Sequence, residues 1–179
     1  MMLFKTTRET PIGEIMAWRT DRGLVALGFS DGVGALRLSL ERRFEGTPVV
    51  ADPSSEVGDA IEAYFSGSTS AFDDLLVDVE GTDLQLRLWE ALRRVPAGTT
   101  TSYGELAAEM ATSPRVVGNA MAANPVCLAL PCHRVIRSDG SWHGYAYGNN
   151  RKGWLLEHER CAATIKNAER VKPARRIAS

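Results

Sequence analysis

The stretch that decides the fold is Asn-Pro-Val-Cys-Leu-Ala-Leu-Pro-Cys-His-Arg-Val-Ile, residues 124–136. Its apolar centre of about five residues is typical of a buried strand. Pro131 has no backbone N–H to donate to a neighbouring strand, so it must end that strand. We therefore expect Cys132 to lie at a strand end.

Cys132 is followed directly by His133. A cysteine near a histidine, in a partly polar setting, can lose its proton and act as a strong nucleophile. The alternative is a buried structural cysteine, and the dipeptide alone does not decide between the two. Because adjacent side chains tend to point apart, the histidine could act on the thiol through a water molecule.

The composition indicates an ordinary soluble globular protein. The chain of 179 residues is long enough for one domain or two small ones, with a core that needs no disulfide or metal. Its hydrophobic fraction is 44% and its charged fraction is 24%. The apolar runs are shorter than a membrane span, and the first residues lack the apolar core of a signal peptide. We expect a cytoplasmic protein with no membrane association.

The three cysteines are Cys127, Cys132 and Cys161, an odd number without a Cys-x-x-Cys pair. This count argues against a disulfide framework and suits a reducing compartment. The three histidines also lie in the last third of the chain, and residues 1–126 contain neither residue type. We therefore expect no metal site in the N-terminal half.

Charge is distributed unevenly along the chain. Residues 1–81 contain seven Lys or Arg and fourteen Asp or Glu, residues 82–159 contain eight and seven, and residues 160–179 contain six and one. An acidic first half is poorly suited to meet phosphate, whereas the later segments could do so.

The first 80 residues are predicted to form a small sheet with helices. Strands are expected at 4–7, 13–20, 24–30 and 75–79, helices at 34–44 and 56–65, and a loop at 48–54. Asp21-Arg22-Gly23 predicts a hairpin, because glycine tolerates a positive φ. Since no nucleophile, base or metal-ligand cluster occurs here, we interpret residues 1–80 as an α+β support domain.

The following residues are predicted to be mainly helical. Thr82 caps a helix that ends at 96–98, and Trp89 is expected to pack in the core. Helices at 102–110 and 113–123, capped by serines and joined by a short connection, have the outline of a helix-turn-helix. A closing helix is expected at 151–160, followed by a basic tail at 161–179.

Further motifs lie at fixed distances around Cys132. They are Gly81-Thr82, Trp89, residues 95–98, residues 101–107, Asn124-Pro125, residues 131–136, Gly144-Tyr145 and residues 152–159. This set resembles the O6-alkylguanine-DNA alkyltransferases, the methylated-DNA–protein-cysteine methyltransferases, closely over residues 81–159 and loosely before them. The resemblance implies an α+β fold: a ribonuclease-H-like domain at 1–80, then a mainly helical domain with a helix-turn-helix at 81–160. It also implies a monomer that needs no cofactor and no metal.

The resemblance implies direct repair of DNA. The alkyl group of O6-alkylguanine would move from a flipped-out base in duplex DNA to Cys132, once per molecule, with O4-alkylthymine as a second candidate substrate. His133 would be the base, Glu159 the carboxylate that polarises it, and Asn124 the residue that holds the turn around the site. Tyr103 would donate a proton to the leaving ring.

The same resemblance implies how the DNA and the base are held. Arg115 would fill the space left by the flipped base, and Tyr103 would rotate the phosphate. The second helix of the pair presents small residues that permit close approach to a groove: Gly118, Ala120 and Ala122. The pocket residues implied are Val135, Tyr145, Ala146, Lys152 and Met121. The connection between Leu106 and Arg115 is about two residues shorter than in typical relatives.

Three other functions compete with this one. A non-catalytic lesion sensor would share the fold, but such proteins replace the cysteine that stands here at position 132. A thiol hydrolase would use Cys132 and His133 and leave the helix pair without a role. A transcription factor would want base-reading polar residues on residues 113–123, where the side chains are mostly small and apolar.

Overall fold

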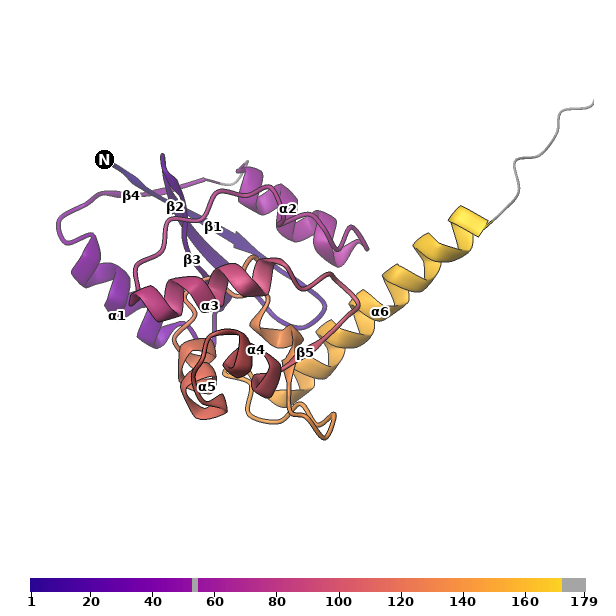
Figure 1. Cartoon of the computed structure of the whole chain (residues 1–179). Helices are drawn as coiled ribbons and strands as arrows, with labels where there is room; N and C mark the ends of the chain where they lie inside the picture. The colour runs from indigo at the N-terminus through magenta and orange to yellow at the C-terminus, as the bar shows by residue number, and fades with distance from the viewer. Residues whose placement is uncertain (53–54, 172–179) are drawn as a thin grey trace, which may run out of the picture.

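A four-stranded sheet forms the centre of the N-terminal half in the computed structural model, which describes residues 1–52 and 55–171 (Figure 1). The strands are β1 (Leu3–Arg8), β2 (Ile15–Thr20), β3 (Gly23–Phe29) and β4 (Val49–Ala51). Their order in the sheet is β3-β2-β1-β4, with β4 parallel to β1 and the other pairs antiparallel.

The predicted hairpin joins β2 and β3. Thr20 pairs with Gly23, which leaves Asp21 and Arg22 as the two-residue turn. Gly23 has a φ of 143°, and a Cβ there would lie 2.6 Å from the carbonyl oxygen of Leu76. Both the backbone angle and the close approach therefore require glycine at this position.

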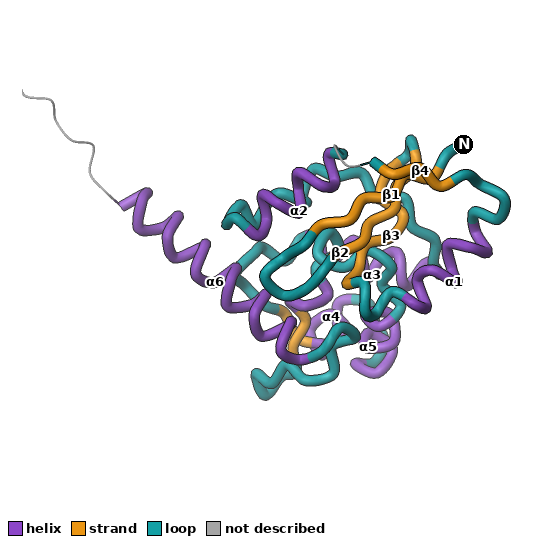
Figure 2. The backbone as a smooth tube through the Cα atoms, turned by 180° about the vertical axis from the view of Figure 1, so that it is seen from behind, coloured by secondary structure: helices purple, strands orange, loops and turns teal. Residues whose placement is uncertain are grey.

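The two faces of the sheet are covered by different parts of the chain (Figure 2). Helix α1 (Gly34–Arg43) packs with Trp18 and Val25 on one face, whereas α2 (Glu56–Phe65) packs with Ile15 and Ala17 on the other. Alternate residues of β2 thus enter different cores, as the two-residue period of a strand requires. The core that contains α2 continues into the C-terminal half.

Two predictions for this half were wrong. Residues 49–51, predicted as loop, form β4 because they pair with β1. Residues 75–79, predicted as a strand, form only an isolated bridge between Val77 and Leu24, and Leu76 is exposed there.

The C-terminal half is mainly helical, as predicted. Its elements are α3 (Asp83–Arg93), β5 (Thr101–Ser102), α4 (Tyr103–Glu109), α5 (Pro114–Ala122), η1 (Cys132–Arg134), β6 (Val135–Ile136) and α6 (Asn149–Val171). Thr82, Ser102 and Ser113 cap α3, α4 and α5 through their hydroxyl groups. The helix-turn-helix prediction is confirmed by α4 and α5, whose connection contains Ala111 at a positive φ of 52°.

The apolar stretch before Cys132 is not a strand. It makes one bridge, between Val126 and Leu27, and then turns through Leu128, whose φ is 69°. Leu130 N–H donates back to the carbonyl of Val126, so the segment coils on itself. Its residues are apolar because the core of the two halves encloses them, and a buried coil gives the same sequence pattern as a buried strand.

Helix α6 is longer than predicted at both ends. It begins at Asn149 rather than at residue 151 and continues to Val171, through the first part of the predicted tail. Beyond Arg160 it extends away from the body of the molecule (Figures 1 and 2). Residues 172–179 of the predicted tail lie outside the described residues. Within the described ranges no helix combines the length and apolar character needed to cross a membrane.

Candidate active site

Cys132 lies at the first position of the short helix η1, directly after the coil that replaces the predicted strand. It is 6% exposed and lines a cavity of about 330 Å³. The other predicted residues that line this cavity are Tyr103, Gly118, Met121, Ala122, Asn124, Tyr145 and Ala146. Helices α1, α4 and α5, the coil and the loop before α6 therefore line one cavity together with Cys132.

Asn124 fixes the coil in front of Cys132. Its Nδ2 donates to the carbonyl of Leu130 at 2.7 Å, and its Oδ1 accepts from the N–H of Val126 at 3.0 Å. One buried amide thus ties both ends of the turn together.

The groups around the Cys132 thiol have opposing effects on its pKa. Burial raises its pKa above the usual range, while the Asn124 amide, the Lys152 ammonium and the Tyr145 hydroxyl each lower it. The Tyr145 hydroxyl has no hydrogen-bond partner among the described residues, although it lies close enough to affect the sulfur. The resting group is a thiol, and a base is required to ionise it.

His133 is fully buried behind Cys132 and points its Nε2 at Glu159 Oε1, 3.0 Å away. Because a carboxylate accepts, Nε2 carries the proton and Nδ1 is left with its lone pair. Nδ1 is buried and has no hydrogen-bond partner within the described part of the chain. Burial lowers the pKa of His133 against the opposing effect of Glu159, so the imidazole is neutral and can accept a proton at Nδ1.

Glu159 is the most heavily bonded side chain of the site. Oε1 accepts from Tyr64 Oη (2.8 Å), His133 Nε2 (3.0 Å) and Arg134 Nη2 (2.8 Å), and Oε2 accepts from Arg134 Nε (2.9 Å) and Gly98 N (3.1 Å). Burial alone would raise the pKa of this carboxyl, but His133 and Arg134 outweigh burial and hold the pKa well below its usual range. Glu159 is therefore a permanent anion behind the histidine.

Lys152 is also fully buried, and its Nζ donates to the carbonyl of Val135 at 2.5 Å. The same Nζ lies 5.9 Å from the ring centroid of Tyr103 and 5.8 Å from that of Tyr145. Burial lowers the pKa of Lys152 to about 8. Lys152 and Val135, both predicted as pocket residues, are buried and do not line the cavity.

The predicted DNA-contacting residues divide into two groups. Arg115 and Ala122 are exposed on α5, and Gly118 is half-buried. Ala120, in contrast, is 3% exposed, packs in the core and accepts the Trp89 Nε1 hydrogen bond at its carbonyl. Ala120 faces inward because it follows Val117 on the buried side of the helix, so we remove it from the DNA-contacting set.

Sequence reasoning missed three groups of this site. Arg134 was visible as the residue after His133 in the motif, and its bidentate contact with Glu159 could have been considered. Tyr64 and the N–H of Gly98 gave no signal, because they meet Glu159 across 95 and 61 positions of the chain.

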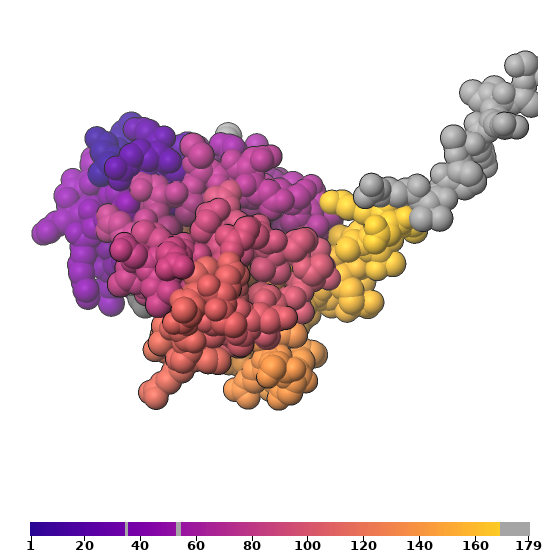
Figure 3. All heavy atoms as spheres, viewed as in Figure 1, coloured from indigo at the N-terminus to yellow at the C-terminus, as the bar shows by residue number. Residues whose placement is uncertain are grey.

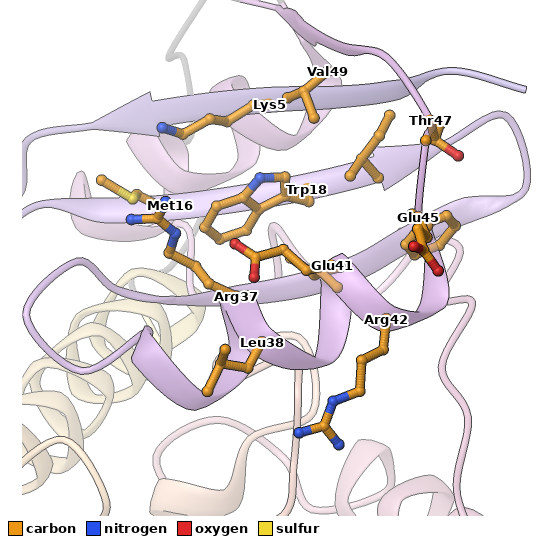
Figure 4. A pocket seen from close by; sticks show the side chains of 14 residues that line it. Lys5, Met16, Trp18, Arg37, Leu38, Glu41, Arg42, Glu45, Thr47 and Val49 are labelled. Atoms are coloured by element: carbon orange, nitrogen blue, oxygen red, sulfur yellow. The ribbon is translucent and has the colours of Figure 1, made fainter.

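A second and larger cavity lies between α1 and the strands β1 and β2 (Figure 4). Its volume is about 760 Å³, and it is lined by β1, β2, α1 and the segment before β4. Trp18 stands at its centre, with Lys5 Nζ 5.8 Å from the ring centroid. It shares no lining residue with the Cys132 cavity.

In the described ranges, no group of three or more His, Cys, Asp or Glu side chains is arranged to hold a metal ion. Beside the helix-turn-helix, the candidate site brings together a buried cysteine, a neutral histidine and a carboxylate. A buried thiol with a base next to it, adjoining a helix-turn-helix, is the arrangement expected of a DNA-binding protein whose cysteine takes part in chemistry.

Comparisons with known proteins identify the family. Residues 3–79 match the ribonuclease-like domain of 6-O-methylguanine DNA methyltransferase, and residues 83–161 match its DNA binding domain. The chain therefore belongs to the 6-O-methylguanine DNA methyltransferase family. Its activity is that of a methylated-DNA–protein-cysteine methyltransferase, a DNA repair enzyme that acts by alkyl transfer, and DNA is its partner.

Relatives and solved structures cover most of the chain. The methylated-DNA–protein-cysteine methyltransferase of Mycobacterium tuberculosis is 38% identical over 168 residues, 90% of this chain and 95% of that protein. The one from Salmonella typhimurium is 41% identical over 125 residues, 68% of this chain and 73% of that protein. The crystal structure of Mycobacterium tuberculosis OGT in complex with DNA has a TM-score of 0.74 at 33% identity, covering 89% of this chain and 94% of that chain.

Proposed function

We propose that Cys132 accepts an alkyl group from O6-alkylguanine that has been flipped out of duplex DNA, and that O4-alkylthymine is a second possible substrate. The observation that carries this proposal is the position of the Cys132 sulfur in a cavity backed by neutral His133 and anionic Glu159. Nucleophile, base and orienting carboxylate are the three groups that covalent catalysis requires.

The transfer step is an SN2 displacement. His133 Nδ1 takes the thiol proton, through a water molecule, and the resulting thiolate attacks the alkyl carbon in line with the O6 atom. The S–C bond forms as the C–O bond breaks, and the electron pair of that bond passes to the guanine. Tyr103, whose pKa is raised by burial and so stays protonated, donates a proton to the departing ring. The thioether that remains on Cys132 is a poor leaving group, so each molecule acts once.

Delivery of the base is assigned to α4 and α5. Arg115 would enter the stack where the base has left, and Tyr103 would press on the phosphate at the cavity rim. Gly118 and Ala122 give α5 a small surface on which a groove can approach closely without reading sequence. In Figure 3 the α5 region and the segment after β6 project side by side at one edge of the molecule.

We further propose a division into a support domain at 1–80, a DNA-binding and catalytic domain at 81–160 and a tail at 161–179. We also propose that the protein acts as a monomer. A cytoplasmic location suits a free thiol that must stay reduced.

Intact-protein mass spectrometry tests the proposal. After incubation with duplex DNA carrying O6-methylguanine, the mass should rise by one methyl group, on the peptide that contains Cys132. Cys132→Ala should show no gain, whereas Cys127→Ala should react, since Cys127 is fully buried and does not line the cavity. An unchanged wild-type mass with tight lesion binding would instead favour a sensor.

A further inference from the structure

One member of the Glu159 network comes from the N-terminal half. Tyr64, the penultimate residue of α2, is fully buried, and its hydroxyl donates to Glu159 Oε1 at 2.8 Å. This is the same oxygen that accepts the Nε2 proton of His133. The support domain therefore contacts the carboxylate of the relay directly.

The Tyr64 hydroxyl is held rigidly in place. Its ring packs against Phe72 at 5.4 Å between centroids and against His158 at 5.3 Å. The Tyr64 carbonyl also accepts from Nε2 of His158, at 2.8 Å, one residue before Glu159 on α6. Trp154 stacks on the His158 ring at 4.8 Å between centroids. Two hydrogen bonds and a ring stack thus lock α2 to the turn of α6 that carries Glu159.

We propose that Tyr64 is a positioning residue through which the N-terminal domain sets the basicity of His133. This inference rests on the role of His133 in the proposed function. Tyr64 touches neither the sulfur nor the substrate cavity, and it acts only through Oε1 of Glu159.

Three groups donate a hydrogen bond to the same oxygen, Oε1 of Glu159. A carboxylate oxygen with three donors spreads its negative charge over all of them, so it attracts the Nε2 proton of His133 less strongly. Removal of the Tyr64 donor would concentrate that charge on His133 and stabilise the imidazolium. The pKa of His133 would then rise, and a larger fraction of the base would be protonated at a given pH.

Other charged and titratable groups face this network and are unchanged by such a substitution. Around His133 they are Arg134, Lys152 and Glu159. Around Tyr64 and Glu159 they are Arg134, Cys127, His158 and, at longer range, Asp73. Tyr64 itself stays a donor, because burial and the Glu159 charge raise its pKa well above 10. A shift in His133 on loss of the hydroxyl alone would therefore report the Tyr64–Glu159 contact.

The test compares Tyr64→Phe with a matched control. Tyr64→Phe retains the ring and leaves two donors on Oε1. Thr6→Val removes another buried hydroxyl of the same half, which bonds Ser55 Oγ at 2.6 Å and the Asp52 carbonyl at 2.8 Å, far from the relay. Both variants lose a buried hydrogen bond, but only Tyr64→Phe alters Glu159.

The first readout is NMR titration of the His133 ring nitrogens in the full chain, which needs no alkyl transfer. We expect the pKa of His133 to rise by about one unit in Tyr64→Phe and to stay unchanged in Thr6→Val. The second readout is the pH profile of Cys132 alkylation by free O6-benzylguanine, whose acid limb should move to higher pH by the same amount.

An unshifted His133 in folded Tyr64→Phe would overturn the proposal, as would an equal shift in Thr6→Val. A measurement in the wild type covers the case of a variant that does not fold. The chemical shift of the Tyr64 hydroxyl proton should change as His133 titrates. A chemical shift that stays constant through the titration of His133 would also overturn the proposal. If His133 shifts but Cys132 is never alkylated, the positioning role stands and the proposed function fails.

Discussion

The two cavities of this protein differ in a way that volume does not explain. The cavity between α1 and the sheet has about twice the volume of the one at Cys132, 760 Å³ against 330 Å³. The larger cavity is walled by Trp18, Lys5, Arg37 and Glu41, and the described residues that line it include no cysteine and no histidine. The smaller one contains a thiol with a base and a buried anion behind it. The reactivity that we propose for Cys132 would therefore depend on the buried groups around the thiol, whose pKa values are shifted, and not on the volume available to a ligand.

The largest effect on stability and on the alkylation rate is expected from removing the buried Glu159 carboxylate near the smaller cavity. Glu159→Ala would leave Arg134 buried without its partner and His133 without its acceptor. We expect a loss of about 3–5 kcal/mol in the free energy of unfolding and of about 100-fold in the rate of Cys132 alkylation. Chemical denaturation and single-turnover kinetics measure the two.

Glu157→Ala is the matched control, two residues earlier on α6. Glu157 is exposed, and its partners among the described residues are Arg160 and Cys161 on the same helix. Its removal should leave the alkylation rate and the midpoint of unfolding nearly unchanged. Similar losses in both variants would mean that the helix, and not the buried anion, sets the difference between the cavities.

A second substitution separates the chemistry of the smaller cavity from the delivery of the base. Arg115 is exposed at the start of α5 and does not line the cavity. Arg115→Ala should slow repair of duplex DNA about tenfold or more, since holding a base out of the stack costs a few kcal/mol. Alkylation by free O6-benzylguanine should be unaffected, and an equal loss in both assays would rule out this role for Arg115.

The contribution of Glu159 to the free energy of unfolding should depend on pH. Glu159 is ionised in the fold at a pH where its unfolded form, with a pKa near 4.5, takes up a proton. Stability from this group is therefore complete above about pH 4.5 and is lost as the pH falls toward the lowered folded value. Each unit of the shift corresponds to about 1.4 kcal/mol. Urea unfolding between pH 5 and pH 3 should show a steeper loss in the wild type than in Glu159→Gln.

The smallest effect is expected in the larger cavity. Arg37→Ala and Glu41→Ala change its charged wall and touch no residue of the relay (Figure 4). Both variants should alkylate Cys132 at the wild-type rate with free O6-benzylguanine. A change of more than about twofold in single-turnover kinetics, roughly 0.4 kcal/mol, would show that the two cavities are coupled.

Local signals in the sequence predicted the parts of the fold that local chemistry governs. Thr82 and Ser102 begin their helices because their hydroxyl groups bond the backbone three residues later, and both caps lie where the sequence places them. The β2–β3 hairpin follows likewise from Gly23. The coil before Cys132 was mistaken for a strand, because an apolar run shows that a segment is buried and not how its backbone is paired.

The motif around Cys132 indicated the nucleophile, the histidine and the family, since these residues are adjacent in the chain and their chemistry depends on residue type. Only the tertiary structure decided that Ala120 faces the core, that Lys152 is buried outside the cavity lining and that Tyr64 donates a hydrogen bond to Glu159. Such contacts join positions up to 95 residues apart, and they exist only when α2 and α6 pack together. The sequence states which side chain stands at each position. The hydrogen-bond partners and the pKa of that side chain depend on which residues the tertiary structure places around it.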